Sequence, residues 1–390
     1  MFVTRLKLQN WRNFRDADIR LRDVCYILGP NASGKSNLLD VFRFVRDIAK
    51  SSGGGLQQAV TARGGLSKVR CLHARSVPEV GIELEVSASI DAPHPAWRYQ
   101  LYITAEPRGA RRLLVKNETV SQIDDSGHEQ IILQRPDSAD EKDVDRLTQT
   151  AMEQIQANAA FRPLVDFFSR TTYLHLVPQL LKYSDTIGGN RLEDDPFGQG
   201  FLERIAKTPE KTRNSRLAKI ERALKQVIPQ LEDLVFDKDV VTGRPHLESR
   251  YVHHRPKAGR QREDQFSDGT LRLIALFWIL LDGDSLLLLE EPELSLNEAI
   301  VRQIPDMINR MMRAKSTRRQ VLITTHSEAL LSNAGIDGRS VLTLSPSFEG
   351  TSIDEPTASE KEAMRHGLSP AEVVLPRVGR TVAGQLALPL

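Results

Sequence analysis

The eight residues GPNASGKS, at positions 29–36, constrain the fold of this chain more than any other feature of its sequence. They fit the pattern GxxxxGK[ST], in which glycines let the backbone curl so that its N–H groups point at phosphate oxygens. The apolar run VCYILG precedes them, and SNLLDVFRFVRDIA follows with apolar residues at helical spacing. Strand, glycine loop and helix is the order that a phosphate-binding loop requires, so a chance Gly-rich turn is the weaker interpretation.

The side chains of this loop suit a triphosphate and a magnesium ion. Lys35 would place its positive charge on the β- and γ-phosphates, and the Ser36 hydroxyl would bind Mg²⁺. The predicted ATP-binding residues are Gly29, Pro30, Asn31, Ala32, Ser33, Gly34, Lys35, Ser36 and Asn37.

A second apolar run, SLLLLEEPELSL, ends in two adjacent carboxylates. Parallel α/β sheets bind their ligands at the carboxyl ends of the strands, which predicts that Glu290 and Glu291 lie beside the glycine loop. Glu290 would support Mg²⁺, directly or through water, and Glu291 would orient and polarise the attacking water. A solvated pair of glutamates at a strand end is the alternative, and it is weaker beside a complete phosphate loop.

Two further motifs follow the same logic. The run QVLITTHSEALL places His326 at the end of another apolar strand, where it could reach the γ-phosphate as a sensor or hydrogen-bond donor. The alternative is that a lone His is more often a surface or core residue than a catalytic one. The stretch FSDGTLR sets Ser267 and Gly269 just before a long apolar run. This is typical of a helix start whose free N–H groups can hold an anion.

Bulk properties leave room for such a protein and argue against several other classes. The chain has 390 residues and a formal net charge of +2, so any basic surface must be local. Cys25 and Cys71 are far apart without CxxC spacing, which fits a reducing cytoplasm better than a disulfide framework. The N-terminus lacks the apolar core of a signal peptide, and the longest apolar run is too short to span a bilayer. We therefore expect a cytoplasmic protein without a membrane partner.

Taken together, these motifs resemble ABC-type ATPases of the SMC/RecF/OLD group, closest to the AAA_21-like ATPases of bacteria and phage-defence loci. NWRNFRD resembles the segment before the phosphate loop, and GPNASGKSNLLD is the Walker A form typical of the group. FSDGTLRLIAL resembles its signature motif, LLLLEEPELSLN its Walker B and D-loop, and ITTHSEALL its switch-histidine loop.

The resemblance implies an α/β fold, a P-loop NTPase head of the ABC type with an antiparallel β subdomain and a helical insert. It divides the chain into an N-terminal ATPase lobe with Walker A at 1–50, a mostly antiparallel β part at 51–137, the helical insert at 138–245, a C-terminal ATPase lobe at 246–375 and a tail at 376–390. Within these parts the patterns predict a sheet over 80–135, an amphipathic helix over 217–234, a strand pair or loop over 246–265 and a helix over 297–314.

The resemblance also implies how the two anion-binding devices of one chain are used. Two heads of the family meet head to tail, and the signature helix of one caps the ATP held by the other. Residues expected to act on the partner's nucleotide are Ser267, Asp268 and Gly269 in the signature and Ser295 and Asn297 in the D-loop. Arg15 matches an arginine that approaches the nucleotide in SMC-like heads. The glutamine that usually contacts Mg²⁺ has no clear match, and Gln57 and Gln58 are its candidates.

The expected partners are a second copy of the chain and a separate effector. The chain after His326 is short for a fused nuclease, so a nuclease or toxin, in a DNA-related or anti-phage system, would be another protein. Basic clusters at 250–262 and 211–225 have the charge of a nucleic-acid contact, whereas a solvated face is the alternative. Besides an ATP-hydrolysing dimer, the sequence allows a nucleotide-gated scaffold that sequesters a toxin or nuclease with little turnover. A transporter motor is disfavoured by the antiparallel part and by EEPELSLN.

Overall fold

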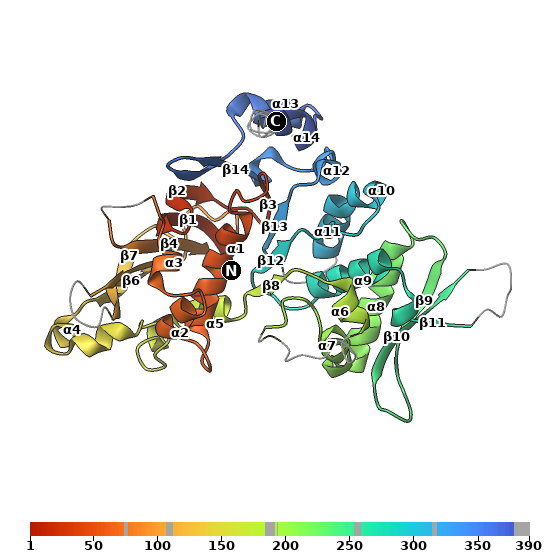
Figure 1. Ribbon diagram of the computed structural model, residues 1–390, viewed down its shortest axis with the longest axis horizontal. Coiled ribbons are helices and arrows are strands. Elements are labelled where there is room, and N and C mark those ends of the chain that lie inside the picture. The colour runs from red at the N-terminus through yellow and green to blue at the C-terminus, as the bar shows by residue number, and fades with distance from the viewer. Residues whose placement is uncertain are drawn as a thin grey trace, which may run out of the picture.

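The computed structural model describes residues 1–73, 77–106, 112–183, 192, 194–252, 259–313 and 318–377. These residues form three sheets with helices around them (Figure 1). Two sheets have six strands each and the third has three. No helix in the described ranges is both long and apolar enough to cross a bilayer.

The first sheet is antiparallel throughout and has the strand order β2-β1-β4-β5-β6-β7. Its strands are β1 (Phe2–Trp11), β2 (Phe14–Arg20), β4 (Val80–Ser87), β5 (Trp97–Ala105), β6 (Leu113–Ile123) and β7 (Glu129–Arg135). In β5 buried residues alternate with partly exposed ones over most of the strand, as expected for a sheet with one covered face. The antiparallel sheet predicted over 80–135 is confirmed, and it also includes the first two strands.

The second sheet is the centre of the molecule, with the order β15-β14-β3-β13-β12-β8. It contains β3 (Val24–Leu28), β8 (Thr172–Leu174), β12 (Leu287–Glu290), β13 (Val321–Thr325), β14 (Val341–Ser347) and β15 (Gly350–Asp354). All pairings are parallel except that of β14 with β15. Strands β3 and β13 are buried along their whole length, because helices cover both faces.

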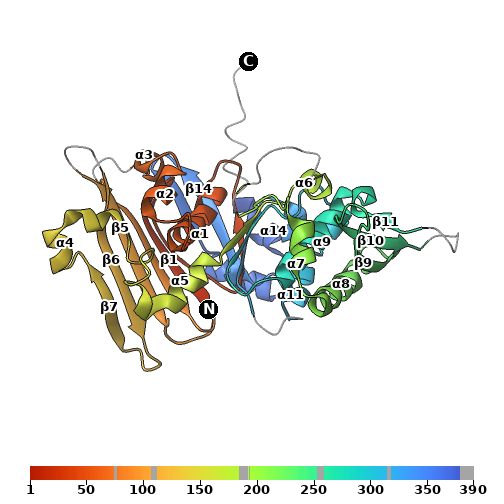
Figure 2. The same ribbon diagram turned by 90° about the horizontal axis from the view of Figure 1, so that it is seen from below.

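The two faces of this central sheet belong to two different hydrophobic cores. On one face α1 (Lys35–Ala49), α2 (Leu56–Thr61) and α5 (Arg162–Ser169) pack with Cys25 and Ile27. On the other face α6 (Pro178–Lys182), α9 (Asp268–Leu281) and α11 (Ile304–Arg313) pack with Tyr26 and Leu28. Successive residues of β3 thus alternate between the cores, and Figure 2 shows α1 and α9 on opposite sides of the strands.

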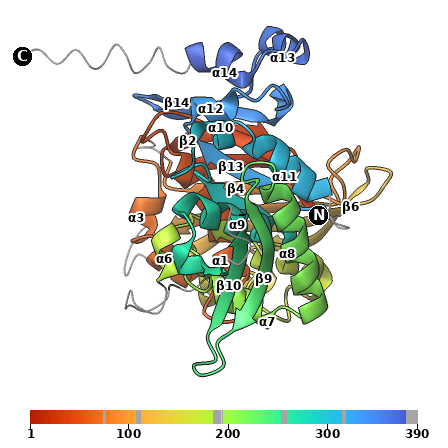
Figure 3. The same ribbon diagram turned by 90° about the vertical axis from the view of Figure 1, so that its right-hand side faces the viewer.

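A smaller unit made of α7 (Phe201–Lys207), α8 (Glu210–Leu224) and the third sheet extends from the second core (Figure 3). This sheet has the order β11-β10-β9, with β9 (Leu231–Lys238), β10 (Pro245–Tyr251) and β11 (Gln261–Arg262). The helix predicted over 217–234 is therefore wrong in its second half. Pro229 has no N–H and its ring disfavours a helical residue before it, so the chain turns and enters β9.

The remaining elements are short. They are α3 (Leu66–Val69), α4 (Ser138–Lys142), α10 (Glu298–Val301), α12 (Glu328–Leu331), α13 (Ala358–Arg365), α14 (Pro370–Val373) and 3₁₀ turns at 144–148, 159–161, 263–265 and 338–340. The single helix predicted over 297–314 is two helices, α10 and α11, because Pro305 cannot donate a hydrogen bond to the preceding turn. Of the tail predicted from 376, all but residues 376 and 377 lies outside the described residues.

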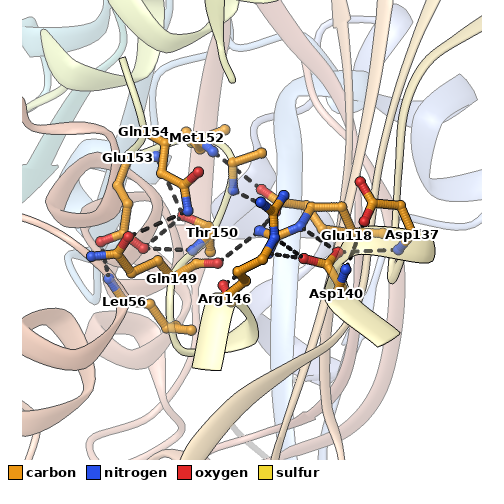
Figure 4. Close-up of polar contacts among 12 residues, drawn as sticks. Leu56, Glu118, Asp137, Asp140, Arg146, Gln149, Thr150, Met152, Glu153 and Gln154 are labelled. Carbon is orange, nitrogen blue, oxygen red and sulfur yellow. Dashed lines mark hydrogen bonds and ion pairs between the residues drawn. The ribbon is translucent and has the colours of Figure 1, made fainter. Parts of the chain in front are cut away.

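A buried polar cluster fastens the segment after β7 to the antiparallel sheet (Figure 4). The Glu118 carboxylate, fully buried, accepts hydrogen bonds from the backbone N–H groups of Ala151 (2.6 Å) and Met152 (3.3 Å). Arg135 pairs with Asp140 through two hydrogen bonds of 3.0 and 2.9 Å. Because each charge has a partner, attraction offsets part of the desolvation penalty that burial imposes on these groups.

Candidate nucleotide-binding and hydrolysis site

The glycine loop joins β3 to α1 at the carboxyl edge of the central sheet. Gly34 has φ +97° and Ala32 has φ +63°, the left-handed conformations that curl the loop back on itself. The Lys35 ammonium group donates to the carbonyl oxygens of Gly29 (2.9 Å) and Pro30 (3.2 Å). Burial lowers the pKa of Lys35, and the nearby carboxylates Glu291 and Glu290 oppose that shift.

Asn13 supports this loop from outside and was not among the predicted site residues. Its Nδ2 donates to the Ser33 carbonyl oxygen at 3.0 Å, and its Oδ1 accepts from Asn37 Nδ2 at 2.8 Å. A Cβ at Gly34 would lie 2.0 Å from Asn13 Nδ2, so only glycine fits there. Its position in the NWRNF segment, just before the loop, was the available signal.

Arg15 lies on β2 with its side chain 61% exposed, and it pairs with Glu349 at 3.6 Å. Its neighbour Arg12 instead faces α1, where it contacts Asp40 at 2.6 Å. Although burial alone would raise it, the pKa of Asp40 is held below its ordinary value by the Arg63 and Arg12 guanidinium groups. This ion-pair cluster fixes the helix that follows the glycine loop.

Glu290 lies at the end of β12 and faces the glycine loop. The Ser36 hydroxyl donates to its Oε1, and the Tyr173 hydroxyl of β8 donates to its Oε2. Burial and then the bond to Glu290 raise the pKa of Tyr173, so this phenol stays a donor. The Arg43 guanidinium lies 4.2 Å from the centre of the Tyr173 ring. The two predicted magnesium ligands, Ser36 and Glu290, are thus brought together.

Glu291 and His326 meet at the ends of the neighbouring strands β12 and β13. The His326 Nδ1 lies 2.8 Å from the Glu291 Oε1. Glu291 has φ +45°, an uncommon conformation for a residue with a side chain, and its N–H donates to the Thr324 carbonyl oxygen at 3.0 Å. Such strain occurs often at functional sites.

The two glutamine candidates for a magnesium contact, Gln57 and Gln58, lie in different surroundings. Gln57 Nε2 donates to the carbonyl oxygens of Leu113 (3.0 Å) and Thr148 (2.7 Å), which lie at the antiparallel sheet. Gln58 lines a cavity with Arg43 and Tyr173. Glu290 is contacted by Tyr173, which lies within the predicted helical insert but belongs to the strand β8.

The signature residues lie at the start of α9, on the other core. The Ser267 Oγ accepts from the Thr270 N–H at 3.1 Å, as a helix N-cap does, and the residue is exposed. Asp268 pairs with Lys182 of α6 at 2.7 Å. A Cβ at Gly269 would lie 3.1 Å from Leu296 and 3.4 Å from the Ser295 carbonyl oxygen. The described hydrogen bonds join none of these signature residues to the glycine loop.

The D-loop follows Glu291 and presents its polar residues to solvent. Ser295 has φ +63° and is exposed. Asn297 is exposed too and caps α10, its side chain accepting from the Ala299 N–H at 2.8 Å. The predicted residues of the partner-facing surface therefore lie on two neighbouring elements, α9 and the D-loop.

The donor set at Ser36 and Glu290 fits magnesium. Mg²⁺ prefers hard oxygen ligands and is commonly held by one or two protein groups together with substrate phosphates. Within the described ranges no cluster of three or more His, Cys, Asp or Glu side chains could hold a metal. A hydroxyl and one carboxylate beside a phosphate loop agree with that requirement.

Three comparisons relate this chain to known proteins. The model of the family described as "AAA domain, putative AbiEii toxin, Type IV TA system", AAA_21, matches residues 26–332, and that of the "P-loop containing region of AAA domain", AAA_29, matches residues 3–45. No curated protein matches the sequence. A solved SmcHead bound to the C-winged helix domain of ScpA covers 94% of this chain, which covers 100% of that one, with 12% identity and a TM-score of 0.53. An Smc head from Pyrococcus furiosus, bound to the C-terminal domain of ScpA, shares 12% identity over 94% of this chain and 98% of its own, with a TM-score of 0.49.

The fold and the loop between β3 and α1 define a P-loop ATPase with the fold of an SMC head, so the predicted fold class is confirmed. Because the first family model spans most of the sequence, the chain belongs to the AAA_21 family of P-loop ATPase domains. Nucleotide binding follows from that membership.

Proposed function

We propose that the chain is an ATPase head that pairs with a second copy around ATP, so that each composite site combines two chains. In each site one chain supplies Lys35, Ser36 and Glu291, and its partner supplies Ser267 and Gly269. The observation that carries this proposal is the placement of α1 and α9 in opposite cores of one sheet. At the glycine loop the polar side chains have hydrogen-bond partners within the chain, whereas the start of α9 is exposed.

Within such a site each residue has a chemical role that its surroundings support. The loop N–H groups and Lys35 bind the phosphates, and Ser36 and Glu290 would hold Mg²⁺, which neutralises charge on the phosphates. Glu291 orients the attacking water and accepts its proton. His326 donates through Nδ1 to Glu291 when that nitrogen is protonated, and a protonated Nε2 can donate to the terminal phosphate.

A mixing experiment tests the composite site. Lys35→Ala removes the phosphate contact, and Ser267→Arg blocks the signature surface, so each variant alone should lack ATPase activity. In a mixed dimer one site combines the intact Lys35 of one chain with the intact Ser267 of the other. An equimolar mixture should regain about a quarter of wild-type activity, since half of the dimers are mixed and each has one intact site. A mixture as inactive as its components would refute pairing.

We further propose that the head controls a separate effector protein, of nuclease or toxin type, in a DNA-related or phage-defence system. Two observations support a partner: the matching family is described through a type IV toxin–antitoxin system, and the similar SmcHead binds the C-winged helix domain of ScpA. Purification of the tagged chain from its native host should yield a second protein in stoichiometric amount. Repeated recovery of the chain alone would count against this proposal.

The case for nucleic-acid contact is weaker on α8 than its charge indicates. Arg213 lies 4.1 Å from the Phe236 ring centre, Arg216 pairs with Asp282, and Lys225 pairs with Glu221. Arg222 also donates to the Ala218 carbonyl oxygen, and Lys219 has a contact too, so most of the six basic side chains at 211–225 have partners within the fold. In the second basic cluster, at 250–262, Arg255 and Lys257 lie outside the described residues. The described arginines of this cluster pair with carboxylates: Arg250 and Arg260 with Asp233, and Arg262 with Glu248.

A further inference from the structure

The signature helix α9 carries one buried arginine, Arg272, which is 2% exposed. Its Nη1 donates to the Leu294 carbonyl oxygen and its Nη2 donates to the Leu176 carbonyl oxygen. One guanidinium group therefore binds two segments that are far apart in the sequence. The planar fork of arginine can bind two acceptors at once, which the single ammonium group of lysine does less well.

Both acceptors lie in segments that directly follow strands of the candidate site. Leu294 belongs to the D-loop, and its N–H donates to the Glu291 carbonyl oxygen at 3.2 Å. Leu176 follows β8, three residues after Tyr173, whose hydroxyl contacts Glu290. Arg272 thus connects the signature helix to the D-loop and to the segment that follows β8.

The same helix and loop also pack directly on one another. A Cβ added at Gly269 would lie only 3.1 Å from Cδ2 of Leu296, so the two residues are in close contact. Leu296 packs against the second core, and its N–H donates to the Glu293 carbonyl oxygen at 3.1 Å. Interiors packed this closely move as units rather than deform, so α9 and the D-loop are held at two points, Gly269 and Arg272.

The electrostatics around Arg272 make these bonds costly to lose. Its Nε is buried without a hydrogen-bond partner in the described part of the chain. The bonds to the Leu294 and Leu176 carbonyl oxygens are therefore the hydrogen bonds that satisfy this guanidinium group. Burial lowers the pKa of Arg272, and Glu293 and Glu291 oppose the shift by attraction. Glu293 is itself only 6% exposed and accepts from the Thr325 hydroxyl beside His326. Removing a partner from such a buried charge is strongly unfavourable.

We propose that Arg272 is a positioning residue that locks the signature helix and the D-loop into one rigid surface, with which the chain completes the ATP site of its partner. This inference rests on the proposed pairing of two heads. Arg272 does not touch the nucleotide in this account. It holds Ser267, Gly269 and Ser295 in fixed relation to one another, so that both elements meet the partner's phosphates together.

A mixed dimer with one intact site tests the proposal. The nucleotide-holding chain carries Ser267→Arg, and the signature-donating chain carries Lys35→Ala. Arg272→Met is then added to one chain or to the other. On the signature-donating chain it should lower kcat/KM for ATP about tenfold to a hundredfold, the usual effect of losing bonds to a charged group. On the nucleotide-holding chain, whose signature is already blocked, the change should stay below about threefold.

Arg319 provides a matched control. It is also 2% exposed, and it donates to the carbonyl oxygens of Ser285 (2.7 Å) and Ile279 (2.8 Å), near the opposite end of α9. Arg319→Met should lower the unfolding temperature comparably, but its effect on kcat/KM should not depend on which chain carries it. Arg272→Lys, which keeps the charge, is the second variant should Arg272→Met not fold. It should show the same dependence on placement to a smaller degree.

Equal losses from Arg272→Met or Arg272→Lys in both placements would overturn the proposal, because a purely structural residue acts in either chain. The reference dimer, without a change at Arg272, separates this failure from that of pairing itself. An inactive reference refutes the composite site, whereas an active reference without placement dependence refutes only the role of Arg272.

Discussion

The two ends of the proposed ATP site differ in how completely one chain satisfies them. At the glycine loop, Lys35 binds loop carbonyls, Ser36 binds Glu290 and Asn13 binds Ser33. At the signature end, residues 270–281 of α9 are buried, yet Ser267 in front of them is exposed. The first end is built to hold a ligand by itself, and the second is a rigid helix start with an open surface.

This difference supports the proposal that the signature end meets the ATP of a second chain. The N-terminus of a long helix attracts an anion through its free N–H groups and its dipole. The start of α9 is exposed at Ser267. Contacts of Arg272 and the ion pair between Lys182 and Asp268 hold this helix start in place. The phosphates of a second chain's ATP have the required charge.

The largest predicted effect comes from a change at the glycine-loop end that removes catalysis and leaves the contacts to ATP in place. Glu291→Gln removes the carboxylate that accepts the proton from water, so kcat should fall about a hundredfold or more. ATP affinity should change little, because Lys35 and the loop are untouched. Steady-state ATP hydrolysis and nucleotide binding measure the two quantities. Glu298→Gln, on the exposed first turn of α10, is the control and should match wild type.

The second prediction concerns stability in the half of the molecule that carries the glycine loop. Burial raises the pKa of Glu118 to about 6, above its ordinary value of 4.5. The folded state therefore holds this proton more tightly than the unfolded chain does. Stability should fall as pH rises through this window, by about 2 kcal/mol from this group.

Glu118→Gln, which cannot titrate, isolates that contribution. Urea unfolding at pH 4.5 and pH 7 measures how much unfolding free energy the protein loses between the two pH values. That loss should be about 2 kcal/mol smaller in the variant than in wild type. An unchanged pH dependence would mean that Glu118 is ionised as easily in the fold as in water.

The third prediction sharpens the description of the magnesium end. Tyr173→Phe removes one hydrogen bond to Glu290 and leaves the ring under Arg43. The Mg²⁺ concentration for half-maximal ATPase activity should rise about tenfold, as is usual when a group that orients a metal ligand is lost. Tyr102→Phe is a matched control, because Tyr102 donates to Glu83 at 2.6 Å on the antiparallel sheet. It should leave the Mg²⁺ requirement unchanged.

The smallest predicted effect addresses the basic helix beside the signature end. Arg216 pairs with Asp282 at 2.8 Å, and its guanidinium lies 5.2 Å from the Trp278 ring centre of α9. Arg216→Ala should cost about 1 kcal/mol of unfolding free energy. Lys211→Ala, on an exposed position of the same helix, should change it by less than about 0.5 kcal/mol. If the two variants lose the same unfolding free energy, the contacts of Arg216 do not stabilise the fold and it behaves as a solvated surface charge.

Much of this architecture is predictable where chemistry requires neighbouring residues. The glycine loop, the Glu290–Glu291 pair and His326 each follow an apolar strand, and parallel strands bring their carboxyl ends together. Their contacts in the structure, Ser36 to Glu290 and Glu291 to His326, agree with that reasoning.

Other parts depend on contacts between distant segments and escape such reasoning. Strand β8 has three residues, and only its pairing with β12 makes it a strand. Tyr173 was therefore not seen as a neighbour of Glu290. Arg272 lies in an apolar helical pattern that does not reveal which carbonyl groups it binds. The end of α8 was predictable, because Pro229 argues against continuing a helix.

The mass of the Glu291→Gln variant in solution tests the central claim most directly. With saturating ATP and Mg²⁺ the account predicts twice the monomer mass, and it predicts the monomer mass without nucleotide or after addition of Ser267→Arg. A variant that binds ATP tightly yet keeps one and the same mass with and without ATP would contradict it.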